Sequence, residues 1–166
     1  KSLHLAALME NKGQLTALDI YSNKLHELKR RARRAGAHNI TTRQISSNKV
    51  IKKLHNRSDR VLIDAPCTGL GVLRRNPDAK WKIDADFLER VKQTQQQILS
   101  AYAFMVKPGG KLIYATCSIL KEENQEQVEQ FLKSPKGTEF TLEKDHFVSP
   151  AKSGFDGFYM ARMIRS

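Results

Sequence analysis

The sequence contains only two cysteines, a single tryptophan and no long apolar run. Cys67 and Cys117 are too few for a disulfide framework, and the simplest interpretation is two buried apolar thiols. Neither belongs to a Cys-x-x-Cys pair or a Cys/His cluster, so we expect no metal site. No segment approaches the roughly 18 apolar residues of a membrane span, and no secretory pattern opens the chain. We therefore expect a cytoplasmic location without membrane attachment.

Acidic residues are scarce in the first part of the chain, and the formal net charge is +12. Residues 1–60 hold 14 Lys or Arg against 4 Asp or Glu, residues 61–121 hold 9 against 5, and residues 122–166 hold 6 against 8. A basic half favours a polyanionic partner such as nucleic acid, because Lys and Arg release counterions from phosphate backbones. A solvated basic face that aids solubility would give the same composition.

The apolar pattern predicts one α/β domain over residues 1–166, without internal repeats. Strands alternate with helices through residue 132, which indicates a mostly parallel sheet with helices on both faces. The last two strands have no helix between them, so we expect an antiparallel hairpin at the edge of the sheet. The predicted strands are 14–20, 40–45, 60–65, 111–115, 138–147 and 157–165, and the predicted helices are 2–10, 23–35, 84–106 and 122–132.

Four polar side chains stand at or just after the ends of predicted strands: Asp19, Asp64, Cys67 and Cys117. In open α/β sheets, ligands bind outside the carboxyl ends of the strands. Asp19 is placed to accept hydrogen bonds from the ribose of a nucleotide-like cofactor, although a turn or a helix cap also favours Asp. This convergence indicates a site at one edge of the sheet.

The segment DAPCTGLG at residues 64–71 fixes an acid beside a thiol. Pro66 restrains the backbone, and the glycines permit close backbone approach. A rigid loop over the carboxyl edge of a sheet is a common place for a site, although a simple strand end with a turn would look similar. The following segment RRNPDAKW, residues 74–81, combines cations with an aromatic ring, which suits phosphate contact and base stacking. We expect Trp81 itself to be a core anchor.

Thr116-Cys117-Ser118 ends a predicted strand, where a cysteine can be held firmly as a nucleophile. One reaction that requires such a group is methylation at carbon 5 of cytosine. Addition of a thiolate to C6 makes C5 enamine-like and able to attack an activated methyl group, and a carboxyl group at N3 assists the addition. Loss of the C5 proton and expulsion of the thiol complete the cycle. Cys117, Asp64 and Cys67 are the right kinds of group, but other chemistries remain open on this evidence.

Two motifs carry a resemblance to a known family. DAPCTG at residues 64–69 followed by RRNPDAKW at 74–81 resembles the fourth motif of the RNA cytosine-C5 methyltransferases, and YATCS at 114–118 followed by EEN at 122–124 resembles their sixth. The resemblance covers nearly the whole chain and is closest to the bacterial 16S ribosomal RNA members. It implies a Rossmann-like sheet, S-adenosyl-L-methionine as cofactor, and RNA as substrate, with ribosomal RNA favoured over transfer RNA.

The resemblance also implies a role for individual residues. Cys117 corresponds to the nucleophile that attacks C6, and Cys67 to the cysteine that assists release of the product. Asp64 corresponds to the acid near the cofactor's methyl end and the target base. Asp19 corresponds to the ribose-binding acid, and Lys1 to the last residue of a Pro-Gly-Gly-Lys loop around the cofactor.

Neighbouring residues complete the expected site, and two departures from the family pattern qualify it. We expect Pro66 to line the cofactor site, and Arg74, Arg75 and Lys80 to contact RNA.

The family's first strand and glycine-rich loop do not precede Lys1, so we expect the first strand of the sheet to be missing and cofactor binding to be weak. QISS at residues 44–47 stands where the family has an Asp near the adenine.

Three other interpretations are open. DNA cytosine-C5 methyltransferases use the Pro-Cys cysteine as nucleophile, which would be Cys67, but the Thr-Cys-Ser motif favours Cys117. A nicotinamide-dependent oxidoreductase could use the same kind of sheet, yet Tyr114 and His146 offer no convincing proton relay. A basic RNA-binding module without catalysis would bind RNA in a salt-sensitive way even without both cysteines.

Overall fold

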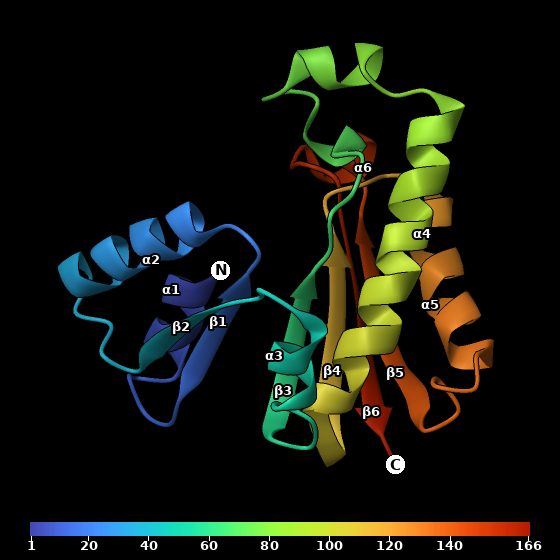
Figure 1. Ribbon diagram of the computed structural model, residues 1–166. Helices are drawn as coiled ribbons and strands as arrows, with labels where there is room; N and C mark the ends of the chain where they lie inside the picture. The colour runs from blue at the N-terminus through green and yellow to red at the C-terminus, as the bar shows by residue number, and fades with distance from the viewer. The chain divides into compact units, whose positions relative to one another are not determined.

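The computed structural model describes residues 1–166, which form two compact units, residues 1–53 and residues 54–166. Figure 1 shows the elements of each unit. Both units place strands beside helices, and parallel strand pairs occur in both. The predicted α/β class, with parallel strands and a C-terminal antiparallel hairpin, is confirmed.

The first unit is built on two parallel strands, β1 (Leu15–Asp19) and β2 (Ile40–Gln44). Helix α2 (Ser22–Arg34) connects them, and it carries three arginines in its last turn, where cations are favoured by the helix dipole. Helices α1 (Ser2–Leu8) and α3 (Asn48–Lys52) flank this pair in the sequence. Each strand and helix lies within about two residues of its predicted range, except α3, which was not predicted.

The second unit contains a four-stranded sheet in the order β3-β4-β6-β5. Its strands are β3 (Ser58–Asp64), β4 (Val106–Thr116), β5 (Phe140–Val148) and β6 (Phe158–Arg165). β3 and β4 are parallel, whereas β6 pairs antiparallel with both β4 and β5. The hairpin therefore joins the sheet through β6 and leaves β5 as the outer strand.

Helices α4 (Ala85–Tyr102) and α5 (Gln125–Lys133) cover one face of this sheet (Figure 1). α4 begins where the Asp84 carboxylate accepts the backbone N–H of Phe87 at 2.6 Å. The core beneath the helices consists of side chains with at most 1% exposure. These are Leu99, Leu112, Tyr114, Val128, Phe131, Tyr159, Ala161 and Met163.

Short elements complete the second unit. They are the 3-10 helices η1 (Leu70–Val72), η2 (Pro77–Trp81), η3 (Ala103–Met105) and η4 (Lys121–Glu123), and the short helix α6 (Pro150–Ser153). β4 begins five residues before the predicted strand, because Val106 pairs with Ser58 and the register then shifts until Lys111 pairs with Arg60. The Pro-Gly-Gly turn therefore lies inside the strand as an irregularity.

Arg165 ties the end of β6 to two distant parts of the second unit. Its side chain is 8% exposed, donates to Asn56 Oδ1 and to the Val106 carbonyl at 2.6 Å each, and pairs with Glu139 at 2.8 Å. We expect Arg165→Met to lower the free energy of unfolding by about 2–3 kcal/mol, because it leaves the buried Val106 carbonyl without this donor and removes the charged hydrogen bonds to Asn56 and Glu139. Arg162→Met, which removes a 49% exposed partner of Glu143, should cost less than about 1 kcal/mol in the same urea titration. Equal losses would contradict this assignment.

Candidate functional site

Two parallel strands of the second unit end side by side and bring the predicted thiols together. Asp64, the last residue of β3, is paired with Ala115 of β4, and the Ala65 N–H donates to the Ala115 carbonyl at 2.9 Å. The loops that follow these strands therefore leave the sheet at the same edge. In them, the sulfurs of Cys67 and Cys117 lie 3.3 Å apart, and both are half-buried free thiols. The structure thus joins Asp64, Pro66, Cys67 and Cys117 in one region, as predicted from the strand ends.

The two sulfurs form a hydrogen bond in which either thiol can be the donor. The hydrogen bond with Cys117 raises the pKa of the Cys67 thiol well above its ordinary value, and burial raises it further. A pair of thiols at this distance suits a site in which one sulfur attacks and the other takes part in proton transfer.

A buried carboxylate lies directly behind the cysteine loops. Glu123 is 0% exposed, and its oxygens accept hydrogen bonds from the Thr68 N–H at 2.8 Å, the Thr68 hydroxyl at 2.5 Å, the Ser118 hydroxyl and the Gln95 amide at 3.1 Å. Sequence reasoning missed this role, because an acid at the start of a helix is also explained by the helix dipole. The only signal was the place of Glu123 in the EEN segment.

The turn around Cys117 is held by side chains of β4 and by Asn124, the residue between η4 and α5. The Thr116 hydroxyl donates to Asn124 Oδ1 at 2.5 Å, and the Asn124 amide donates to the Ser118 carbonyl at 3.0 Å. The Tyr114 hydroxyl donates to the Glu123 carbonyl at 2.8 Å. These contacts are all buried, so the turn is fixed by the protein interior and not by solvent.

Gly71 allows three backbone segments to meet beside Cys117. Its N–H donates to the Cys117 carbonyl at 2.9 Å, and its carbonyl accepts from the Gly157 N–H at 2.7 Å. A Cβ at Gly71 would collide with the Gly157 carbonyl oxygen and lie 2.7 Å from that of Cys117. The close backbone approach expected from the glycines of the loop is therefore observed at this position.

The remaining predicted cofactor residues belong to the first unit. Asp19 ends β1, and its Oδ1 accepts the Tyr21 N–H at 2.8 Å. Helix α2 starts at the next residue, Ser22, and no side chain caps its first turn. The side-chain amide of Gln44, at the end of β2, donates to the carbonyl of Ile20, the residue directly after β1, at 3.0 Å. Lys1 stands at the start of α1, and its carbonyl accepts the Leu5 N–H.

The three predicted RNA-contacting cations lie on the loop between β3 and α4. Arg74 donates to the Gly154 carbonyl at 2.9 Å, and Arg75 pairs with Asp156 at 2.5 Å while its side chain remains 70% exposed. The Lys80 ammonium lies 4.8 Å from the centre of the Trp81 ring.

The prediction that Trp81 is a core anchor was wrong, because its side chain is 81% exposed. η2, which carries it, is a short 3-10 helix without a single buried residue. An exposed aromatic ring beside Lys80 is instead the composition of a stacking surface for bases.

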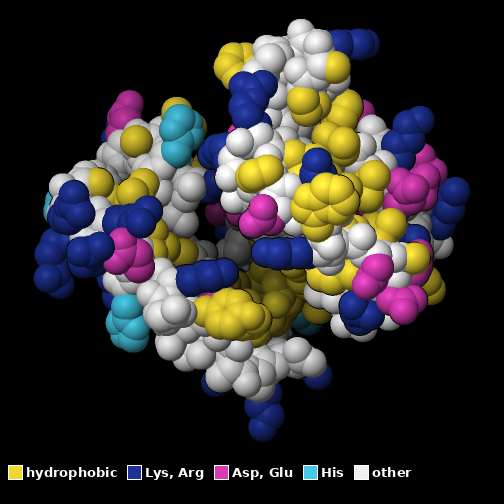
Figure 2. Space-filling view, turned by 90° about the horizontal axis from the view of Figure 1, so that it is seen from above, with side chains coloured by type: hydrophobic (Ala, Val, Ile, Leu, Met, Phe, Trp, Pro, Cys, Tyr) yellow, Lys and Arg dark blue, Asp and Glu magenta, His cyan; other side chains and the backbone are white.

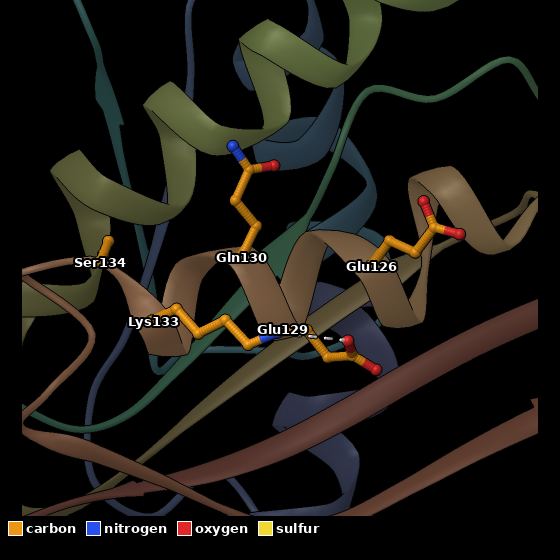
Figure 3. A pocket seen from close by; sticks show the side chains of 5 residues that line it. All are labelled: Glu126, Glu129, Gln130, Lys133 and Ser134. Carbon is orange, nitrogen blue, oxygen red and sulfur yellow. Dashed lines mark ion pairs between the residues drawn. The ribbon is translucent and has the colours of Figure 1, made fainter.

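Each unit also has a distinct surface feature. A pocket along α5 is lined by Glu126, Glu129, Gln130, Lys133 and Ser134, none of which was predicted to act (Figure 3). Lys and Arg side chains gather over the first unit in Figure 2, where α2 contributes Lys24, Lys29, Arg30, Arg31, Arg33 and Arg34. No group of three or more metal-ligating side chains occurs, and no helix is long and apolar enough to cross a membrane.

Comparison with known proteins identifies relatives of this arrangement. A family model described as 16S rRNA methyltransferase RsmB/F matches residues 1–164. A probable ribosomal RNA small subunit methyltransferase B of Bacillus subtilis is 40% identical over 133 residues, covering 80% of this chain and 30% of that protein. The ribosomal RNA small subunit methyltransferase B of Photorhabdus laumondii is 34% identical over 157 residues, covering 92% of this chain and 37% of that protein. The chain thus spans about a third of the length of these relatives.

A solved structure is similar to this chain over nearly all of its length. NSun6 from Pyrococcus horikoshii, crystallised with SFG, superposes with a TM-score of 0.85 and 27% sequence identity, covering 98% of this chain and 44% of that one. The predicted Rossmann-like class is confirmed by this likeness.

We expect Gly71→Ala to lower the free energy of unfolding by about 3 kcal/mol, the upper end of overpacking costs, because both obstructing atoms are backbone oxygens. Gly154→Ala provides the matched comparison, since Gly154 has open space around it and only a positive φ of 71°. It should cost about 1 kcal/mol. Urea titrations measure the free energy of unfolding of both variants. A Gly71→Ala variant as stable as wild type would show that the backbone around Gly71 can move to accommodate a Cβ at little cost.

The raised pKa of Cys67 predicts a shift in its alkylation when Cys117 is removed. Only the thiolate reacts, so a raised pKa delays alkylation to higher pH. Cys117→Ala removes the largest cause of the increase, and the pH midpoint for alkylation of Cys67 should fall, while burial keeps it above that of an unhindered thiol. Mass spectrometry after iodoacetamide treatment across a pH series measures it. An unchanged midpoint, with equal reactivity of both proteins in urea, would contradict the coupling.

Proposed function

The chain belongs to the RsmB/F family of 16S rRNA methyltransferases, and from that premise we propose that it transfers a methyl group from S-adenosylmethionine to carbon 5 of a cytosine in RNA, with 16S ribosomal RNA as substrate. The observation that carries this proposal is the 3.3 Å contact between the sulfurs of Cys67 and Cys117 at the carboxyl ends of two parallel strands. An RNA methyltransferase has little use for two adjacent thiols unless a covalent intermediate must be formed and released.

Cys117 is the nucleophile in this scheme. Its sulfur bonds to C6 of the cytosine, and the electron pair of the C5–C6 double bond becomes available at C5. Asp64 assists at N3, where a carboxyl group stabilises the charge that addition places on the ring. The bound cofactor supplies an electrophilic methyl group.

Cys67 completes the cycle by assisting elimination. After methylation, the proton on C5 passes to a base such as water, the electron pair of that C–H bond re-forms the C5–C6 double bond, and the bond between C6 and the Cys117 sulfur breaks, which restores the aromatic ring. The Cys67 sulfur, 3.3 Å from that of Cys117, lies where it can exchange a proton with the leaving sulfur. The Thr116-Cys117-Ser118 motif supports Cys117, and not Cys67, as the attacking group.

S-adenosylmethionine fits the chemistry of the residues proposed to hold it. Asp19, at the carboxyl end of the parallel strand β1, offers a carboxylate to the ribose hydroxyls. Lys1, Asp64 and Pro66 are proposed to line the methionine and methyl end. Support comes from NSun6 of Pyrococcus horikoshii, which was crystallised with SFG, an analogue of S-adenosylmethionine.

RNA contact is proposed for the loop that carries Arg74, Arg75 and Lys80. Cations position a phosphate backbone, and single-stranded RNA bases stack on exposed aromatic rings. The 81% exposure of Trp81 beside Lys80 supports such stacking. We further propose that residues 1–166 act as one catalytic domain, in the cytoplasm, where ribosomal RNA is modified.

The proposal predicts a covalent protein–RNA band when the full-length protein is incubated with S-adenosylmethionine and RNA containing 5-azacytidine. A nitrogen at position 5 has no proton to lose, so elimination stops at the adduct. We expect the band on a denaturing gel to vanish in Cys117→Ala and to persist in Cys67→Ala. Unmodified RNA should give no lasting band with wild type.

A different nucleophile or a different function would change the pattern of covalent bands on the gel. Loss of the band only in Cys67→Ala would move the nucleophile to the Pro-Cys loop. No band in any variant, with salt-sensitive RNA binding intact, would favour a non-catalytic RNA-binding role or another substrate, such as transfer RNA, which a repeat of the gel with that RNA would separate.

A further inference from the structure

We propose that Glu123 is a positioning residue that sets the distance between the Cys67 and Cys117 sulfurs, and so the proton transfer between them. The kinetic part of this inference rests on the proposed function, whereas the structural part concerns the thiols alone. Glu123 acts through the residues that directly follow the two cysteines.

The attachment of the two loops to Glu123 is symmetrical. Thr68 directly follows Cys67, and Ser118 directly follows Cys117. The hydroxyls of both residues donate to the same oxygen, Oε2 of Glu123, and they lie 3.3 Å from each other. The second oxygen, Oε1, accepts the Thr68 N–H at 2.8 Å. One carboxylate therefore fixes the residue next to each sulfur.

The surroundings of Glu123 make a purely structural explanation insufficient. Its hydrogen-bond partners Thr68, Ser118 and Gln95 are all neutral, and no Lys or Arg pairs with its carboxylate. Burying a carboxylate without a cation is costly, and an apolar side chain of similar size is usually a better core residue. What an apolar side chain cannot do is hold two separate loops at one point through directed hydrogen bonds.

The point of attachment is itself rigid relative to the sheet. The Tyr114 hydroxyl, buried in β4, donates to the Glu123 carbonyl at 2.8 Å. Gln95 of α4 bridges Glu123 Oε1 and the Pro66 carbonyl, at 3.1 Å and 2.9 Å. Glu123 therefore attaches both cysteine loops to β4 and α4. A substitution at Glu123 removes this shared attachment and leaves both thiols chemically unchanged.

The test measures how closely the thiols are held, independently of RNA. Oxidised glutathione converts the two cysteine thiols into one disulfide and releases two molecules of reduced glutathione. An intermediate of this reaction is a mixed disulfide between one cysteine and glutathione. The equilibrium ratio of the protein disulfide to this mixed disulfide gives the effective concentration of one thiol at the other. We expect Glu123→Ala to lower that effective concentration by about tenfold or more, since it removes charge-assisted hydrogen bonds to both loops. Glu126→Ala, an exposed acid one turn away on α5, should leave it unchanged.

Glu123→Gln separates positioning from charge. The amide oxygen can still accept from Thr68 and Gln95, and the Thr68 and Ser118 hydroxyls can rotate to accept from the amide NH₂. We expect Glu123→Gln to restore most of the effective concentration that Glu123→Ala loses. An equally low effective concentration in Glu123→Gln and Glu123→Ala would overturn the proposed positioning by hydrogen bonds and assign the effect to the buried charge.

Kinetics provide the functional readout in the full-length protein. Glu123→Ala should lower kcat for methylation by about tenfold or more while the KM values for RNA and cofactor stay near those of wild type, because the thiols and not the binding surfaces are displaced. If Glu123→Ala does not fold, the double variant Thr68→Val with Ser118→Ala removes both hydroxyls and leaves the carboxylate bonded to the Thr68 N–H and Gln95.

The outcomes are distinguishable. An effective concentration equal to wild type in a folded Glu123→Ala or double variant overturns the inference. A lowered effective concentration in a protein whose wild type shows no methylation of any RNA would support the positioning role and refute the proposed function instead.

Discussion

The second unit depends on the need of one buried carboxylate for hydrogen-bond donors. Glu123 is removed from water, and its donors come from the loop after β3, the loop after β4 and helix α4. A carboxylate in that position is tolerated only when all of these segments have reached their places together. The requirement therefore penalises structures in which one cysteine loop has formed and the other has not, and it converts two local turns into one cooperative site.

Much of the fold followed from local patterns in the sequence. The apolar run before Asp64 and the helical spacing before Pro108 each predict an element whose own residues carry the signal. The hairpin followed from the short, turn-rich connection between the last two strands, in which the structure has only the four-residue helix α6. The start of β4 did not, since a Pro-Gly-Gly turn normally lies outside a strand. Here it survives as an irregularity between paired residues, which only the partner strand decides.

The site was predictable in its members but not in its geometry. Parallel strand ends placed Asp64, Cys67 and Cys117 at one edge, yet the pairing of Asp64 with Ala115, which brings the two cysteine loops to the same point of that edge, is a long-range register. Glu123 escaped residue-level reasoning because its sequence context fits a solvated helix start equally well. Trp81 was misplaced because hydrophobicity favours burial in general, whereas a ring on a short outer turn has no core to enter.

The backbone junction at Gly71 has a consequence for the order of synthesis. A ribosome releases the loop with Gly71 and then the turn with Cys117 before it has made Gly157, whose N–H completes the junction. During translation the Gly71 N–H and the Cys117 carbonyl can therefore meet first, whereas the Gly71 carbonyl lacks its donor until Gly157 has emerged. The three-segment junction beside Cys117 can close only when the start of β6 has been synthesised.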